Sequence, residues 1–357
     1  MAGCPEALAT AYDVALLDLD GVVYVGPDVV PGAADTLAAA RDLGMRTAFV
    51  TNNAFRTPEE IAAHLLALAI PATEADVVTS AQAAARLLKD RLPPGAPVFV
   101  AGGEGLRREV VAAGLTLAAG AEDRPAAVVQ GYTPDADYAM LAEATLAVTA
   151  GAWWVAANRD ATMPSPRGRL PGNGALVALV AAATGRQPVV AGKPEWALHR
   201  ESVERTSAGH PLVVGDRLDT DILGAVRGGT DSLLVLTGVT DPAELLRCDE
   251  SSRPTYVAAD LDGLLRPHPE VRVDVSGDRV TARCGAWLAT ADGGRLHLTT
   301  DGPPGGDDSE SLDPLRALCG AAWAHAMTGS LVPTGASPAA EEALRRLGLL
   351  ATTSRGA

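Results

Sequence analysis

The sequence predicts an α/β protein with a doubly wound parallel sheet, an inserted α/β domain and a small α+β domain at its carboxyl end. Aliphatic runs of strand length alternate with longer alanine-rich stretches over most of the 357 residues. This alternation is typical of βαβ units, in which helices cover both faces of a parallel sheet. After about residue 265, apolar and polar residues alternate between Gly and Asp turns, which indicates antiparallel strands.

The individual elements follow from these patterns, and two of the helical stretches open with a proline near the first turn. We expect parallel strands at residues 14–19, 47–50, 98–101, 127–129, 154–156, 212–214, 233–236 and 256–258. Helices are expected at 31–43, 58–68, 137–149, 174–183 and 195–205. The tail is expected to hold antiparallel strands at 271–275, 280–284 and 295–299, a polar loop at 303–308 and a helix at 312–327.

The length of the chain and the spacing of its polar motifs predict three domains. About 140 residues separate Thr51 from Lys193, which is too many for one crossover between parallel strands. We therefore expect a core domain from residues 1–82 and 186–264, a cap domain from 83–185 that closes over the core, and a carboxyl-terminal α+β domain from 265–357.

The charge and composition restrict the function. Lys and Arg number 29 against 44 Asp and Glu, a net charge of −15 that repels nucleic acid and anionic lipid, so we expect no nucleic-acid and no membrane partner. No basic leader or long apolar segment is present in the sequence, which favours a soluble cytoplasmic protein. The four cysteines form no C-x-x-C pair and are expected to be free thiols.

Two acidic motifs follow predicted strands. Asp18 and Asp20, before Gly21, lie two residues apart and so share one face of an extended chain. Asp216 follows Gly215 at the end of another aliphatic run, with Asp221 in the same turn. Because the carboxyl ends of parallel strands lie along one edge, these acids are expected to meet there. Oxygen ligands without a nearby histidine point to Mg²⁺; turn or helix-capping roles are the alternative.

Two further motifs supply groups that bind phosphoryl oxygens. Thr51, Asn52 and Asn53 follow a predicted strand and offer a hydroxyl and backbone amides. Lys193 lies between Gly192 and Pro194 and is one of only two lysines among 29 basic residues. A compact ammonium at this position suits both a carboxylate and a phosphoryl group.

The segments D-L-D-G-V, T-N-N, G-K-P and G-D-R-L-D-T-D-I, in this order, resemble the haloacid dehalogenase-like phosphohydrolase superfamily, in its branch with a large cap inserted between the second and third motifs. The resemblance covers residues 12 to 262 and implies a Rossmann-like core. It implies that Asp18 is the nucleophile and that Asp20 is the acid and base. It also implies that Mg²⁺ binds the Asp18 carboxylate, the Asp20 carbonyl and Asp216.

The same resemblance assigns supporting roles. Thr51, the Asn52 amide and Lys193 hold the phosphoryl oxygens, and Asn53 is expected to bind the substrate beside them. Asp221 orients Lys193, and Gly21 and Gly215 are supporting residues. In the cap, Asn158 and Asn173 are expected to face the substrate, with turn-holding as the alternative. The glycines at 102, 103 and 105 look like a dinucleotide-binding turn, but Arg108 stands where a third glycine is needed.

The predicted function is therefore a Mg²⁺-dependent phosphomonoesterase for a small phosphorylated metabolite, with D-glycerol 3-phosphate implied by the resemblance. Phosphoglycolate, pyridoxal phosphate and nucleotide monophosphates are alternative substrates, because contacts in the cap decide the substrate. A phosphate-ligand sensor without catalysis is the alternative from another class. The tail resembles a shortened acetyltransferase-like fold without that family's pyrophosphate-binding turn, which favours a non-catalytic role. A homodimer is left open.

Overall fold

The computed structural model describes the whole chain except residues 164, 166, 302–310, 326–331 and 351–357. Its contacts divide the chain into two compact units. One unit comprises residues 14–29 and 46–211, and the other comprises 1–13, 30–45 and 212–357. Both combine helices with parallel strands, which confirms the predicted α/β class. The boundaries predicted for the core, cap and carboxyl-terminal domains stay a prediction.

The first unit (14–29 and 46–211) contains the parallel strands β1 (Val14–Leu17), β4 (Arg46–Thr51) and β5 (Val77–Thr79), paired in that order. All four residues of β1 and the last five of β4 are buried. The hairpin β2 (Tyr24–Val25) and β3 (Asp28–Val29) follows β1. Helices α4 (Ser80–Arg91) and α8 (Trp196–Thr206) pack against each other, and α3 (Pro58–Ala67) and the short helix η1 (Glu74–Asp76) accompany these strands.

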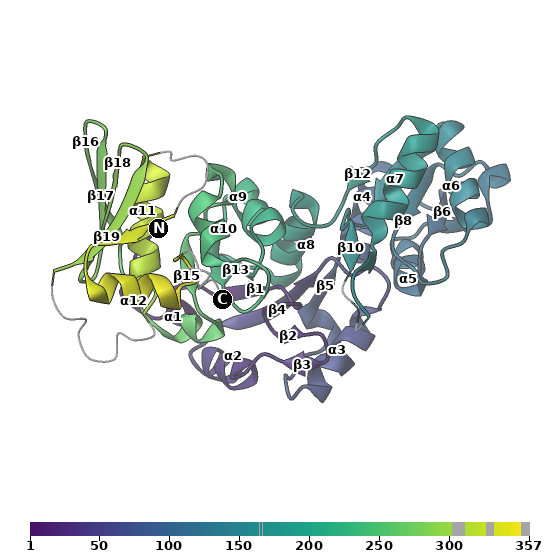
Figure 1. Cartoon of the computed structure of the whole chain (residues 1–357). Helices are drawn as coiled ribbons and strands as arrows, with labels where there is room; N and C mark the ends of the chain where they lie inside the picture. Colours follow the sequence, from purple (N-terminus) through teal and green to yellow (C-terminus); the bar gives the residue numbers. More distant parts are fainter. Residues whose placement is uncertain (164, 166, 302–310, 326–331, 351–357) are drawn as a thin grey trace. The chain divides into compact units, whose positions relative to one another are not determined.

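A second sheet in the same unit carries the inserted segment. Its five strands are all parallel, in the order β12 (Val189–Val190), β9 (Trp153–Ala156), β8 (Ala127–Gln130), β6 (Pro97–Ala101) and β7 (Thr116–Ala118). The other elements are α5 (Glu104–Ala112), η2 (Ala121–Asp123), α6 (Tyr138–Thr149), α7 (Asn173–Thr184) and the pair β10 (Thr162–Met163) and β11 (Leu170–Pro171). Figure 1 shows α6 and α7 beside this sheet.

The second unit contains the parallel strands β13 (Pro211–Gly215), β14 (Asp231–Val235) and β15 (Tyr256–Ala258). Five short helices accompany them: η3 (Leu218–Ile222), α9 (Leu223–Gly228), α10 (Pro242–Arg247), η4 (Glu250–Ser252) and η5 (Leu261–Leu265). Two amino-terminal helices also belong here, α1 (Leu8–Ala11) and α2 (Ala33–Asp42). The acidic turn after β13 leads directly into η3.

The carboxyl-terminal part of this unit is a sheet in the order β16 (Arg272–Ser276), β17 (Arg279–Cys284), β18 (Trp287–Asp292), β19 (Arg295–Thr300) and β20 (Thr334–Gly335). The first four strands are antiparallel, which was predicted for β16, β17 and β19, and β20 is parallel to β19. Helices α11 (Asp313–Ala324) and α12 (Pro338–Arg346) follow. The strand β18 was not predicted, and the polar loop expected at 303–308 lies outside the described residues.

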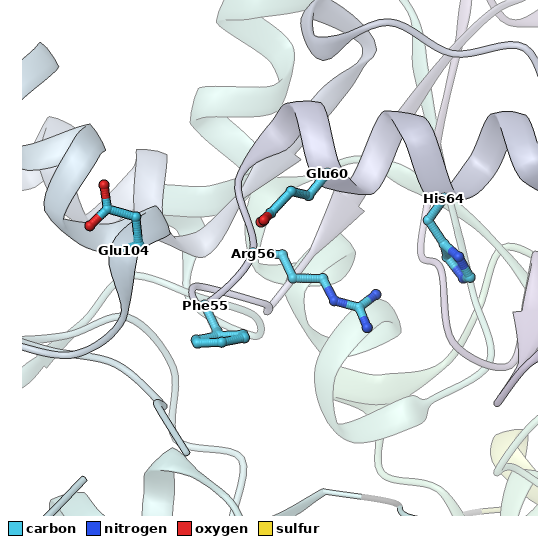
Figure 2. A pocket seen from close by; sticks show the side chains of 5 residues that line it. All are labelled: Phe55, Arg56, Glu60, His64 and Glu104. Atoms are coloured by element: carbon cyan, nitrogen blue, oxygen red, sulfur yellow. The ribbon is translucent and has the colours of Figure 1, made fainter. Parts of the chain in front are cut away.

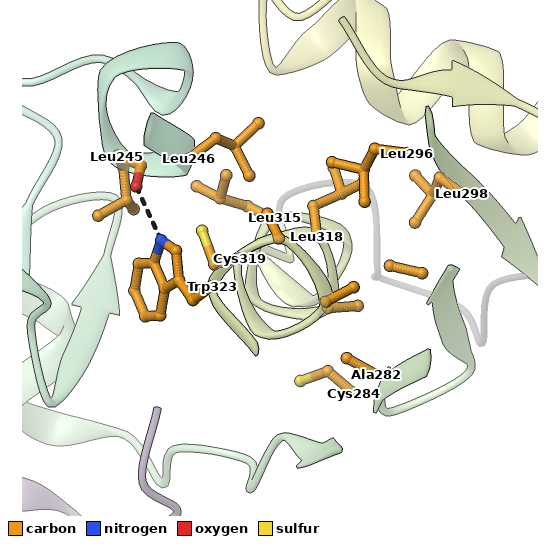
Figure 3. Packing of buried hydrophobic residues seen from close by; sticks show 14 of the residues in the cluster. Leu245, Leu246, Ala282, Cys284, Leu296, Leu298, Leu315, Leu318, Cys319 and Trp323 are labelled. Carbon is orange, nitrogen blue, oxygen red and sulfur yellow. Dashed lines mark hydrogen bonds between the residues drawn. The ribbon is translucent and has the colours of Figure 1, made fainter. Parts of the chain in front are cut away.

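One hydrophobic core joins this sheet to the helices of the same unit. Leu315, Leu318 and Cys319 of α11 are fully buried between the sheet and Leu245 of α10 (Figure 3). Trp323 closes this core and donates a hydrogen bond from Nε1 to the Leu245 carbonyl at 3.2 Å. Burial of leucine side chains contributes roughly 1.5–3 kcal/mol each, so α11 stabilises the unit substantially. Among the described residues, no helix has the length and apolarity needed to cross a membrane.

Candidate active site

A buried ion pair lies at the carboxyl ends of β1 and β4. Asp18 follows the last residue of β1, and the Lys193 ammonium contacts its Oδ1 at 2.5 Å. The ammonium also donates to the Val50 carbonyl of β4 at 3.1 Å. The side chains of Lys193 and Asp18 are 4% and 14% exposed. Because an unpaired buried charge costs several kcal/mol, each group holds the other ionised at this edge.

Asp20 lies beside this pair in a tight turn. Gly21 has a φ of 85°, which suits glycine, and its amide donates to the Tyr24 carbonyl at 2.8 Å. Part of Asp20 faces solvent, yet the protein around its carboxyl displaces water and raises the pKa above the ordinary 3.8. The positive charges of Lys193, Arg56 and His64 oppose this shift. A carboxyl with a raised pKa can donate a proton and later accept one.

The turn after β4 is fixed by its own side chains. Thr51 is buried, and its Oγ1 accepts a hydrogen bond from the Asn53 amide at 3.1 Å. The Asn53 Oδ1 then accepts from the amides of Phe55 and Arg56, both at 2.9 Å. Such side-chain-to-backbone bonds are typical of Asx turns and leave the loop with little freedom.

Asn52 connects three segments that are far apart in the sequence. Its Oδ1 accepts from the Lys193 amide at 2.8 Å, and its Nδ2 lies 3.2 Å from the Lys193 carbonyl. The same Nδ2 lies 3.2 Å from both carboxylate oxygens of Asp160. The Asn52 carbonyl accepts from Ser80 at 2.6 Å and from Asn158 at 2.7 Å. This one residue therefore fixes the backbone that carries the Lys193 ammonium.

The two cap asparagines bind backbone groups. Asn158 is 5% exposed, and its Nδ2 is the group that donates to the Asn52 carbonyl. Asn173, at the start of α7, is 1% exposed and donates to the Asn158 carbonyl at 2.8 Å. These contacts favour the turn-holding interpretation of both residues. Their predicted contact with substrate stays a prediction.

The second unit holds an acidic turn of its own. Asp216 follows β13 and is 1% exposed, and its Oδ2 accepts from the Val239 amide at 2.7 Å. A Cβ on Gly238 would lie 1.9 Å from the same oxygen, so only glycine fits there. The backbone thus closes tightly around the Asp216 carboxylate and fixes its orientation.

Asp221 explains the glycine at the end of β13. It lies in η3, is 1% exposed, and its Oδ2 accepts from the Arg217 amide at 3.3 Å. A Cβ on Gly215 would lie 2.2 Å from the Asp221 Cβ. The close approach therefore requires glycine at position 215.

Within the first unit, the structure brings together Asp18, Asp20, Lys193 and the turn of Thr51 and Asn52. Sequence reasoning missed four residues that hold or surround them, namely Tyr24, Arg56, His64 and Ser80. Arg56 and His64 line a pocket of about 350 Å³ together with Phe55, Glu60 and Glu104 (Figure 2). The capping box formed by Thr57 and Glu60 is the local sequence signal here, because it places the start of α3 directly after the loop that carries Arg56.

Family models match three parts of the chain. Residues 15–116 match the haloacid dehalogenase-like hydrolase family, and residues 190–264 match the HAD-hydrolase-like family. Residues 284–349 match the GCN5-related N-acetyltransferase-like domain.

Curated relatives and solved structures agree with these matches. The chain is 45% identical to a D-glycerol 3-phosphate phosphatase of Mycobacterium tuberculosis, over 89% of this chain and 88% of the relative. It is 37% identical to a 5′-nucleotidase of Bacillus subtilis, over 69% and 94%. A crystal structure of the glycerol phosphate phosphatase of M. tuberculosis with magnesium aligns with a TM-score of 0.85 and 42% identity, covering 97% of this chain and 100% of that one.

These matches agree with the order of the four motifs and with the buried Asp18–Lys193 pair at the strand ends. The family is one of phosphoric monoester hydrolases that depend on Mg²⁺ and form an aspartyl phosphate. The chain belongs to the haloacid dehalogenase-like hydrolases, in the branch of phosphatases with a large inserted cap.

Proposed function

We propose that this enzyme hydrolyses D-glycerol 3-phosphate to glycerol and phosphate, with Asp18 as its nucleophile. The observation that carries the proposal is the Lys193 ammonium, 2.5 Å from the Asp18 carboxylate, with the raised-pKa acid Asp20 two residues on. The substrate follows from the relative of M. tuberculosis that is named for it and aligns over 88% of its length.

The roles of the residues follow from their chemistry. An Asp18 oxygen attacks phosphorus as the bond to the alcohol oxygen breaks, and Asp20 gives its proton to the leaving alkoxide. Asp20 then takes a proton from water, whose oxygen attacks phosphorus and releases phosphate and the free Asp18 carboxylate. Lys193 and the Thr51 turn hold the phosphoryl oxygens, and Asn52 positions Lys193. Loss of one such donor costs on the order of 10² to 10³ in rate.

The donors fit Mg²⁺. Asp18 in the first unit and Asp216 in the second offer carboxylate oxygens, and Asp20 offers a carbonyl; all are hard ligands. The tight backbone around Asp216 fixes its carboxylate for such a ligand. We propose that these three groups hold the ion, and that Asp221 orients Lys193. When bound, Mg²⁺ neutralises the negative charge that otherwise repels a phosphate.

The remaining parts of the proposal concern the setting. We propose that residues 1–82 and 186–264 form the catalytic core, that residues 83–185 form the cap, and that residues 265–357 form a non-catalytic domain. The net charge of −15 supports an enzyme of small cytoplasmic metabolites, without nucleic-acid or membrane partners. It leaves open whether two copies associate.

The test is an initial-rate screen for phosphate release with Mg²⁺ and with EDTA. The panel holds D- and L-glycerol 3-phosphate, phosphoglycolate, pyridoxal phosphate and AMP. We expect the D isomer to give the highest kcat/KM, EDTA to abolish turnover, and Asp18→Asn to lose it while the fold is kept. Full activity in Asp18→Asn would refute the mechanism, and a clear preference for another ester would refute the substrate.

A further inference from the structure

The pocket of Phe55, Arg56, Glu60, His64 and Glu104 is connected through Tyr24 to the general acid of the proposed reaction. Asp20 forms an isolated β-bridge with Tyr24, whose ring lies edge-on to His64 with centroids 5.2 Å apart. The charges of Arg56 and His64 act on the Asp20 carboxyl, which places both within electrostatic reach of it. A chain of contacts therefore leads from the acid to the pocket of about 350 Å³.

The backbone of Arg56 is fixed by a hydrogen bond, whereas its side chain is available to contact a ligand. Its amide donates to Asn53 Oδ1 at 2.9 Å, and the residue is exposed. Among the described residues, no hydrogen bond or ion pair of its guanidinium is found. Figure 2 shows this guanidinium directed toward the side of the pocket on which His64 lies. In a chain with a net charge of −15, an arginine whose guanidinium forms no described hydrogen bond or ion pair is available to bind a ligand.

The pocket is built by a close approach between two segments. The Gly105 amide donates to the Phe55 carbonyl at 3.1 Å, and a Cβ on Gly105 would lie 2.7 Å from the Arg56 carbonyl. A Cβ on Gly103 would lie 2.5 Å from the Phe55 ring. The glycines that look like a dinucleotide-binding turn therefore serve to bring α5 and Glu104 against the loop of Arg56.

The charges of the pocket select its ligand. Glu60 uses Oε2 to accept from the Thr57 amide at 2.8 Å, and Glu104 pairs with Arg108 at 3.0 Å. Two carboxylates beside one arginine disfavour a second anion on the substrate. Hydroxyl groups suit the same set, because a hydroxyl accepts from a guanidinium and donates to a carboxylate or an imidazole.

On these grounds we propose that Arg56 recognises the hydroxyl groups of the leaving alcohol, so that the enzyme selects phosphate monoesters of small polyols. This inference rests on the proposed function, because the leaving oxygen must contact Asp20 for protonation. The carbons beyond that oxygen then extend toward the groups around Asp20. Arg56 offers them up to five N–H donors, with the Glu60 carboxylate as an acceptor.

The experiment compares two esters with the same three-carbon chain, glycerol 3-phosphate and n-propyl phosphate, which lacks hydroxyls. In Arg56→Gln we expect kcat/KM for glycerol 3-phosphate to fall roughly 10- to 100-fold, mainly through KM, the effect of one hydrogen bond from a charged donor. The value for n-propyl phosphate should stay within about twofold of the wild type, since the chemistry at phosphorus is unchanged. Lys89→Gln, which removes an exposed positive charge on α4 away from this pocket, is the control and should change the kinetics on neither substrate.

Each other outcome has a definite meaning. Equal losses on both esters with a displaced pH profile would overturn the inference, since Arg56 would then act through Asp20. Unchanged kinetics on both esters, or an undiminished preference for glycerol 3-phosphate in Arg56→Gln, would also overturn it. A wild-type enzyme that turns over n-propyl phosphate as well as the polyol ester would refute the proposed substrate and this inference together. Melting temperatures show whether each variant is folded.

Discussion

The link between Asn52 and Asp160 gives a prediction whose size follows from its geometry. In Asn52→Asp, the donor Nδ2 is replaced by an oxygen of a carboxylate. That oxygen would face both oxygens of Asp160 and the Lys193 carbonyl, each now 3.2 Å from the donor. Two like charges about 4 Å apart near a protein surface repel by about 4 kcal/mol. Relaxation reduces this, so we expect the free energy of unfolding to fall by about 2–4 kcal/mol.

The rescue by Asp160→Asn makes the prediction specific. An amide at position 160 can donate to a carboxylate at position 52, so the double variant should recover about half of the loss. Recovery should be partial, because the Lys193 carbonyl still faces an oxygen. Asn53→Asp is the control, since the Asn53 side chain acts only as an acceptor in the hydrogen bonds described and a carboxylate keeps that role. It should change stability by less than about 0.5 kcal/mol.

The assay is the melting temperature in EDTA together with kcat on a small phosphate ester with Mg²⁺. A loss of 2–4 kcal/mol corresponds to a fall in melting temperature of roughly 4–12 °C. The kcat of Asn52→Asp should fall with it, because the Lys193 backbone loses its anchor, and should rise again in the double variant. An Asn52→Asp enzyme as stable as the wild type, or a double variant with purely additive losses, would refute this account of the turn.

Three further predictions concern the second unit. Gly238→Ala should weaken Mg²⁺ binding at least tenfold by calorimetry, because its Cβ would displace the Asp216 carboxylate; unchanged affinity would exclude Asp216 as a ligand. Burial lowers the pKa of His268 below 6.5, while its Nε2 bonds to the Gly263 carbonyl at 2.8 Å. Because the unfolded chain then binds more protons, stability should be complete above pH 6.5 and decline below it, and His268→Gln should flatten this decline in urea titrations. Burial raises the pKa of Cys248 to about 12, so a thiol reagent at pH 8 should react with it far faster after unfolding; equal rates would contradict this environment.

The contact between Asp18 and Lys193 could be predicted because the chemistry of both residues is tied to strand ends. Asp18 follows an aliphatic run, and parallel strands bring such ends to one edge, so its pairing with Lys193 needs only the topology and the scarcity of lysine. The partners of Asn52 could not be predicted in the same way. They lie 108 and 141 residues away, and no local pattern encodes which turns meet.

Elements with weak hydrophobic signals were also missed. In β18, two of the three buried residues are alanines, Ala289 and Ala291, whose small side chains give only a weak hydrophobic signal. The pocket of Arg56 escaped prediction because its walls come from two segments about fifty residues apart. In contrast, the parallel strands with long aliphatic runs were located to within two or three residues.

The bonds of Asn52 also bear on how chimeric enzymes of this family can be assembled. Transplanting the inserted segment from a relative would exchange Asp160 while leaving Asn52 and Lys193 behind. A donor segment without an oxygen acceptor at that point would leave the asparagine side chain with half of its hydrogen bonds, and the graft would loosen the lysine loop although no residue there was altered. Recombination sites chosen only from the ends of the inserted segment would therefore overlook the contact that Asp160, inside that segment, makes with Asn52.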